Sequence, residues 1–209
     1  MLTLTKETRD ALTPKMAIQL LQEGNKRFVR NLQFDRNLLK QANETSEGQH
    51  PFAFVLSCID SRTSAELIFD QGLGDIFSCR IAGNILNDDI LGSMEFAAKI
   101  GGAKLIMVLG HTECSAIKGA CDHLWMGHLS GLLAKIEPAV LEEKTETKRD
   151  SQNVAFVEKV SSINVKQVTK QIPQRSGIIN DMLKSGEIAI IGGVYNVATG
   201  VVEFSQNFA

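Results

Sequence analysis

Three short, uninterrupted apolar runs constrain the fold of this chain more than any other feature of the sequence. They lie within residues 52–56, 104–110 and 187–194. Apolar runs of this length without alternation are typical of strands that are buried on both faces, as in parallel sheets. Because helical patterns separate these runs, we predict an α/β fold. Its mostly parallel central sheet has about four parallel strands plus an antiparallel edge strand, and helices flank it.

Turn residues and breaks in periodicity position the remaining elements of the predicted sheet domain. A further strand is predicted over 75–81, and the turn at Thr199 and Gly200 makes the last strand antiparallel. Pro173 is expected to break a helical pattern, because proline lacks the backbone donor. Helices are predicted over 63–70, 88–100, 115–121 and 176–185, and the last strand over 201–204. Residues 129–171 are predicted to be mainly helical, with the charge-rich piece 142–150 as a solvated helix end or loop.

The N-terminal part of the chain has a different character. Thr13 is suited to cap a helix, because its hydroxyl can accept a hydrogen bond from a backbone N–H of the first turn. Pro14 fits the first helical position, where a backbone N–H has no partner within the helix. Segment 35–50 is polar and poorly patterned, so it is predicted to cross the surface. We therefore divide the chain into an N-terminal helical arm at 1–48 and an α/β domain at 49–209.

Charge and composition exclude several classes of partner. The net charge is −2 and the pI is about 6.1, with no basic stripe, so nucleic acid is not an expected partner. The apolar runs are far shorter than the ~20 residues that span a bilayer, so no membrane partner is expected. Residues 1–20 carry five charged side chains and no continuous apolar core, unlike a signal peptide, so a cytoplasmic location is expected.

Two short clusters of chemically active residues follow the first and third strands. Cys58 and Asp60 come directly after residues 52–56, and His111 and Cys114 come directly after residues 104–110. Ligands of open α/β sheets bind beyond the carboxyl ends of the strands. If these two strands are neighbours in the sheet, the clusters meet at one edge.

Two thiolates, an imidazole and a carboxylate are ligand types that zinc takes, usually four at a time. If Asp60 turns away to Arg62, the remaining Cys₂His site is neutral and leaves a position for water, which predicts a catalytic zinc. Three alternatives remain from spacing alone. They are a structural zinc with the same four ligands, no metal with Cys58 and Cys114 as buried packing residues, and a Cys58–His111 nucleophile pair.

The two clusters resemble the signatures of the β-class carbonic anhydrases. Residues 57–62 read Ser-Cys-Ile-Asp-Ser-Arg and residues 110–114 read Gly-His-Thr-Glu-Cys. Between them, residues 80–84 match the family pattern Arg-x-Ala-x-Asn. The resemblance covers nearly the whole chain. It implies a parallel-sheet α/β unit that pairs into dimers through the N-terminal helices and often assembles into tetramers.

The activity that the resemblance implies is reversible hydration of CO2 to bicarbonate and a proton by a zinc-bound hydroxide. Carried over by position, Cys58, His111 and Cys114 are the permanent ligands of one Zn²⁺ per chain. Asp60 and Arg62 form a catalytic dyad, and Asp60 is also the ligand that closes the site in one subclass. The expected partners are the small-molecule substrate and further copies of the chain.

Substrate-binding residues also follow from the resemblance. Gln49, Phe77, Ala82 and Phe96 would form the substrate site, with Gln49, Phe77 and Phe96 facing the zinc of the partner subunit. Gln49 is typical of the subclass whose site stays open. The other subclass has Trp where this chain has Val55, so the open subclass is favoured.

Two departures from the family pattern stand near the expected site. Ser115 follows the second signature where the family has Gly, and Phe96 replaces a Tyr that many open-subclass members carry. Both are expected to affect the rate more than metal binding. Two other functions remain open at this point, namely a hydrolase of a CO2 analogue (CS2 or COS) on the same scaffold, and a non-catalytic zinc or redox-sensing protein.

Overall fold

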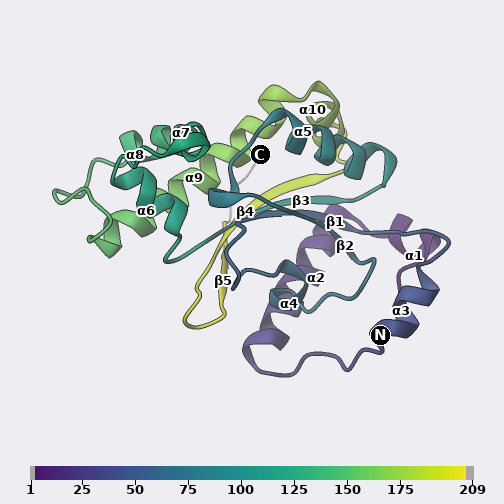
Figure 1. Ribbon diagram of the computed structural model, residues 1–209. Helices are drawn as coiled ribbons and strands as arrows, with labels where there is room; N and C mark the ends of the chain where they lie inside the picture. Colours follow the sequence, from purple (N-terminus) through teal and green to yellow (C-terminus); the bar gives the residue numbers. More distant parts are fainter. Residues whose placement is uncertain (1–2, 206–209) are drawn as a thin grey trace.

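The computed structural model describes residues 3–205 and has a five-stranded sheet at its centre, in the order β2-β1-β3-β4-β5 (Figure 1). The first four strands of this order run parallel, and β5 pairs with β4 in the antiparallel direction. The predicted sheet is confirmed in both respects. The strands are β1 (Ala53–Ser57), β2 (Ile76–Arg80), β3 (Leu105–His111), β4 (Ala189–Tyr195) and β5 (Val202–Phe204).

Helices cover both faces of the sheet, which explains why β1 and β3 are buried along their whole length and mostly apolar. Every residue of these two strands is buried. Phe54 and Leu56 of β1 pack toward one face, and Ala53 and Val55 toward the other. The first face is covered by α5 (Asp88–Glu95), α9 (Val154–Arg175) and α10 (Gly177–Lys184), and the second by α2 (Pro14–Val29) and α4 (Ala65–Ile68).

Three short helices form a lobe at the left end of the sheet in Figure 1. They are α6 (Ser115–Cys121), α7 (Gly127–Leu133) and α8 (Glu137–Glu142). Their apolar side chains pack with Phe156 and Val160 of α9 and with Cys58 and Cys114, in a cluster separate from the two that flank the sheet. The lobe therefore lies against the strand ends that carry the two predicted clusters.

The helix predictions were wrong in several places. Segment 35–50 contains α3 (Leu38–Glu44), which begins where the Asn37 side chain accepts a hydrogen bond from the backbone N–H of Lys40. Its apolar residues Leu38 and Leu39 are exposed, so the segment shows no core-facing pattern that a sequence could reveal. The mainly helical stretch 129–171 is divided into three helices, α7, α8 and α9, and the irregular segment 143–153 between the last two confirms the helix end or loop predicted at 142–150.

Proline and helix type account for two further differences. Pro173 lies inside α9, and the helix continues past it to Arg175. The turns before the proline are held by core contacts of Val165, Val168 and Ile172, so the backbone hydrogen bond that proline cannot make is lost only in the last turn. The predicted helix 88–100 continues from α5 into a π-helical turn at Phe96–Ile100. A π turn carries one extra residue, and such turns are frequent at functional sites.

The N-terminal segment is fastened to the sheet domain by a buried carboxylate. The Asp70 side chain is 1% exposed and pairs with Arg27, at 2.5 Å from Nε to Oδ2, and with Arg36. The centroid of the Phe34 ring lies 4.2 Å from the Arg27 guanidinium carbon. The first residues of α2 also join the core, since Ala17 is fully buried. The division into an arm at 1–48 and a domain at 49–209 stays a prediction.

Helix α1 (Lys6–Asp10) completes the N-terminal segment. Among residues 3–205, no helix is long and apolar enough to cross a membrane.

Candidate metal centre

The adjacency of β1 and β3 brings the two predicted clusters together. Ser57 pairs with Leu109 in the parallel register, so the residues that follow each strand leave the sheet side by side. The ligand atoms of Cys58, His111 and Cys114 all lie within 4.8 Å of one another. Each of these residues is 4% exposed or less. The predicted meeting of the clusters is confirmed.

The two sulfur atoms have the separation that a shared metal requires. Cys58 Sγ and Cys114 Sγ are 3.9 Å apart, and both cysteines are free. A disulfide needs about 2.05 Å, whereas two sulfurs bound tetrahedrally at ~2.3 Å from zinc lie about 3.8 Å apart. Without a metal, the two sulfurs share one proton through their hydrogen bond, which lowers the pKa of one thiol, Cys58, and together with burial raises the pKa of the other, Cys114. A cation removes this competition and lets both sulfurs ionise.

His111 is held with one ring nitrogen aimed at the cluster. Its Nδ1 lies 2.8 Å from the carbonyl oxygen of Thr112, so Nδ1 carries the proton and donates it to that oxygen. Nε2 is then a lone-pair acceptor, and it is buried without a hydrogen-bond partner among residues 3–205. Ser161 of α9 donates its hydroxyl to the His111 carbonyl, which fixes the backbone. Metal-binding histidines usually have this arrangement, so the site fits zinc.

A backbone amide also favours the thiolate of Cys58. Gly83 N–H donates to Cys58 Sγ at 3.4 Å from within a 3-10 turn at Ala82–Asn84. Gly83 has φ +67°, and a Cβ there would lie 2.6 Å from Cδ1 of Ile136. Only glycine fits this position without a shift of the lobe, because both the backbone conformation and the space exclude a side chain.

Asp60 faces Arg62 and stands apart from the three-residue cluster. Arg62 donates from Nε to Oδ1 at 2.9 Å and from Nη2 to Oδ2 at 2.8 Å, and its backbone N–H donates to Oδ1. These hydrogen bonds hold the pKa of Asp60 well below its usual range. The predicted dyad is therefore formed, and the role of Asp60 as a metal ligand stays a prediction.

Two residues outside the dyad hold the loop that carries it. Thr63 donates its hydroxyl to the carbonyl oxygens of Cys58 at 3.0 Å and Asp60 at 2.9 Å. Arg80 donates to the same two carbonyls at 3.0 and 2.5 Å. Sequence reasoning missed Thr63 and Ser161 as parts of the site. Their partners are backbone carbonyls, which leave no signal in side-chain spacing.

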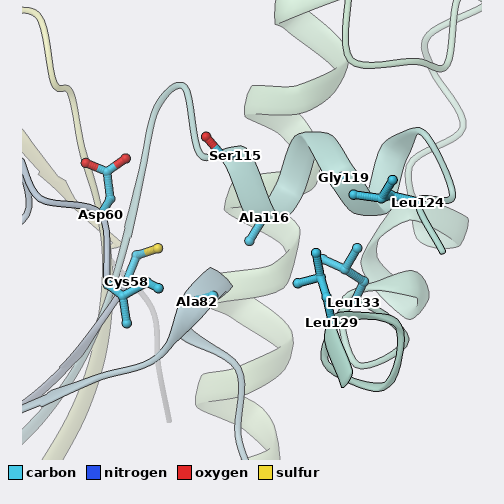
Figure 2. A pocket seen from close by; sticks show the side chains of 10 residues that line it. Cys58, Asp60, Ala82, Ser115, Ala116, Gly119, Leu124, Leu129 and Leu133 are labelled. Atoms are coloured by element: carbon cyan, nitrogen blue, oxygen red, sulfur yellow. The ribbon is translucent and has the colours of Figure 1, made fainter. Parts of the chain in front are cut away.

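A cavity of about 430 Å³ opens beside the cluster (Figure 2). Cys58, Asp60 and Ser115 lie at its polar end, and Ala82 and Ala116 form its middle. At the far end, Gly119, Leu124, Leu129 and Leu133 of the α6–α7 region face inward; we call these four residues the leucine arm. Sequence reasoning missed the leucine arm, because its members carry no polar chemistry.

The predicted substrate residues are placed in three different regions. Ala82 lines the cavity. Gln49 lines a separate surface hollow beside Gly74. Phe77 and Phe96 pack edge to face with ring centroids 6.3 Å apart, and Phe96 is 54% exposed. Within residues 3–205 of one chain, these three residues do not join Ala82, so their role toward a partner's site stays a prediction.

Comparisons with known proteins agree with the geometry. The carbonic anhydrase family model matches residues 53–202. The carbonic anhydrase of Mycolicibacterium smegmatis is 34% identical over 93% of this chain and 94% of its own length.

Solved structures of the same kind share the fold. The β-carbonic anhydrase CcaA is 26% identical, with a TM-score of 0.72 over 90% of this chain and 94% of that chain. A tetrameric β-carbonic anhydrase of Sordaria macrospora has a TM-score of 0.69 over 79% of this chain and 85% of its own. At 21% identity it indicates the fold alone.

Proposed function

Because the chain belongs to the carbonic anhydrase family, we propose that Cys58, His111 and Cys114 hold the zinc ion with which it hydrates carbon dioxide. The enzyme is a lyase that interconverts CO2 and water with bicarbonate and a proton. Hydrolysis of a CO2 analogue and a non-catalytic zinc or redox-sensing role are not favoured by its relatives.

One observation carries the assignment of the metal site. The lone pair of His111 Nε2 is buried and without a partner among the described residues, beside two sulfurs 3.9 Å apart. Two thiolates and a neutral imidazole balance the charge of a divalent cation. When bound, zinc supplies a Lewis acid that lowers the pKa of water toward neutrality.

Asp60 is proposed to orient the water and not to store its proton. Its carboxylate lies at the polar end of the cavity and accepts hydrogen bonds. Since Arg62 holds the pKa of Asp60 well below its usual range, the carboxylate stays ionised at neutral pH and can accept a hydrogen bond from the water, whose proton leaves to solvent. Arg62 also fixes both carboxylate oxygens through its fork.

A complete substrate site is proposed to need a second copy of the chain. Ala82 walls the cavity of one subunit, and Gln49, Phe77 and Phe96 are proposed to reach the zinc of the other. Half-exposed Phe96 supports this, because a ring of this size gains free energy when a partner covers it. The assembly is proposed to be a dimer or a tetramer, formed through residues 1–48. A cytoplasmic location without nucleic-acid or membrane partners is proposed from the sequence alone.

The test combines metal content with stopped-flow CO2 hydration at pH 7 and pH 9. We expect one zinc per chain and fast hydration at both pH values. Cys58→Ala should lose both, while Cys79→Ala, which removes a free cysteine outside the cluster, should keep both. A Cys58→Ala protein that binds zinc and hydrates CO2 like the parent would overturn the assignment.

A further inference from the structure

We propose that Asn164 of α9 is a positioning residue for Cys58, on which it acts through the backbone of Gly83. The Asn164 side chain donates a hydrogen bond to the carbonyl oxygen of Gly83, and the N–H of Gly83 donates to the sulfur of Cys58. This role rests on the proposed zinc site and extends it to a helix that supplies no ligand. Retention of the metal should therefore depend on a residue that never touches it.

The hydrogen bond from Asn164 is buried and joins distant parts of the chain. Its Nδ2 lies 2.9 Å from the Gly83 carbonyl oxygen, and 81 residues separate the two. The Asn164 residue is 2% exposed. Asparagine is a poor residue for a helix interior, and burying its amide is unfavourable unless the amide is hydrogen-bonded. Asn164 therefore does not serve the helix, and its contribution is the contact with Gly83.

Two other buried polar residues of α9 show what is particular to Asn164. Thr169, at 3% exposed, donates its hydroxyl to carbonyl oxygens of its own helix. Ser161, one turn before Asn164, donates out of the helix to the carbonyl oxygen of His111 at 3.2 Å. Because residues three apart lie on one face of a helix, Ser161 and Asn164 hold the backbones of His111 and Gly83 from the same face.

The two donors lie where α9 passes from the lobe to the sheet. Val160, directly before Ser161, packs in the apolar cluster of the lobe. Val165, directly after Asn164, packs in the cluster on one face of the sheet. Apolar contacts on both sides therefore fix this turn of the helix. A side chain can position another group only when its own location is fixed in this way.

The backbone of Gly83 needs such an outside contact. Glycine permits the left-handed conformation found here, at φ +67°, but it permits many others as well. The hydrogen bond that closes the turn runs from the N–H of Asn84 to the carbonyl oxygen of Ile81 and uses neither polar group of Gly83. When Asn164 holds the Gly83 carbonyl, one of the two peptide planes that meet at this glycine is fixed. Rotation of the other plane, whose N–H lies 3.4 Å from Cys58 Sγ, is then limited.

A hydrogen bond to a sulfur ligand changes both its charge and its mobility. The N–H draws electron density from the sulfur, and hydrogen bonds of this kind tune the properties of metal–thiolate centres. The same bond opposes rotation of the Cys58 side chain when its bond to a metal breaks. Loss of the Asn164 donor should therefore loosen Cys58 and leave the His111 side of the cluster to Ser161.

The test measures metal release and metal absorption in the fully loaded protein. Asn164→Leu keeps the branched shape of the side chain but has no donor. A chelating dye should take zinc from this variant about tenfold faster than from the parent, at the lower end of the effect of losing a partner of a metal ligand. After replacement of zinc by cobalt, the sulfur-to-cobalt charge-transfer band should move to longer wavelength, because the sulfur has lost a hydrogen bond.

Thr169→Val is the matched control, since it removes a buried hydroxyl from the same helix without touching Gly83. It should lower the free energy of unfolding and keep both the zinc release and the cobalt band of the parent. Ser161→Ala should speed zinc release and leave the sulfur band in place, because its partner is His111. If Asn164→Leu does not fold, Asn164→Ala takes its place, since alanine is the best helix former and also lacks the donor.

The outcomes separate a positioning role from a purely structural one. Faster release together with the shifted band in the Asn164 variant supports the inference. An Asn164 variant that loses stability as Thr169→Val does, yet keeps the release rate and the band of the parent, overturns the inference and leaves the CO2 hydration of the parent untouched. A parent protein that takes up neither zinc nor cobalt disproves the proposed function as well.

Discussion

Among the carboxylates of this enzyme that pair with arginine, Asp60 and Asp70 lie in very different surroundings. Asp60 has one arginine two residues away, Arg62, whose side chain is 48% exposed. Asp70 is 1% exposed and has two arginines from a distant part of the chain, Arg27 and Arg36. The first pair is local and lies beside a cavity, while the second joins the N-terminal segment to the sheet domain.

The difference shows why the proposed catalytic role suits the Asp60–Arg62 pair and a structural role suits Asp70. The Asp60 side chain is 14% exposed and its partner Arg62 is 48% exposed, so water can replace the lost contacts of Arg62 more readily than in a pair that is buried on both sides. Removing one partner from a buried pair leaves an uncompensated charge and costs about 3–5 kcal/mol. Asp70 cannot leave its two arginines without that loss of stability, so its role is structural.

The largest expected effect is on stability and belongs to Asp70→Asn. The free energy of unfolding should fall by about 3–5 kcal/mol, because two arginines lose a buried counter-charge. Urea denaturation followed by circular dichroism measures it. Asp150→Asn removes a carboxylate from an exposed pair with Lys148 and should change stability by less than about 0.5 kcal/mol. Equal effects in the two variants would show that burial of Asp70 adds nothing to its contribution to stability.

The next effect is on activity and belongs to Asp60→Asn. An amide offers one acceptor oxygen, so it cannot receive both donors of the Arg62 fork and it misorients at the cavity. We expect kcat for CO2 hydration to fall about a hundredfold, with unfolding changed by less than about 1 kcal/mol. Asp70→Asn, assayed at low temperature where it is folded, should keep its kcat. A loss of stability in Asp60→Asn as large as that in Asp70→Asn would show that both ion pairs are needed for the fold.

The smallest effect is a change in the acid dependence of stability. Burial by itself raises the pKa of Asp70, but the hydrogen bonds from Arg27 and Arg36 outweigh it and leave the pKa lowered. The stability that Asp70 contributes is therefore complete above its unfolded pKa of about 3.9 and is lost as the pH falls through the lowered folded value. Urea midpoints measured from pH 6 to pH 2 should fall less steeply in Asp70→Asn than in the parent. Identical slopes would contradict the pKa direction.

The sequence was a good guide wherever structure and chemistry are local. The apolar runs of β1 and β3 and the residues just after them predicted the sheet, the adjacency of the clusters and the Asp60–Arg62 pair. All of these depend on spacings of a few residues and on one rule of strand adjacency.

What could not be predicted depends on contacts between distant segments. The leucine arm exists because α6 and α7 pack together, and Leu124 and Leu133 read as ordinary core residues in the sequence. Asp70 shows no partner nearby, since its two arginines lie 43 and 34 residues away. Helix α3 was missed because its apolar residues are exposed and show no core-facing pattern. The continuation of α9 through Pro173 was missed because the sequence does not show how close the proline lies to the end of the helix.

The parallel sheet has a consequence for the order in which the molecule folds. Strands β3 and β4 are neighbours, yet residues 112–188 separate them along the chain. Closing so long a loop costs more chain entropy than closing residues 58–75 between β1 and β2, so the last pairing is expected to form late. All three cluster residues lie at or before Cys114, whereas Ser161, which steadies His111, arrives with the late segment. The three cluster residues can therefore come together before α9 packs, and the hydrogen bond from Ser161 then fixes the His111 backbone as a late step.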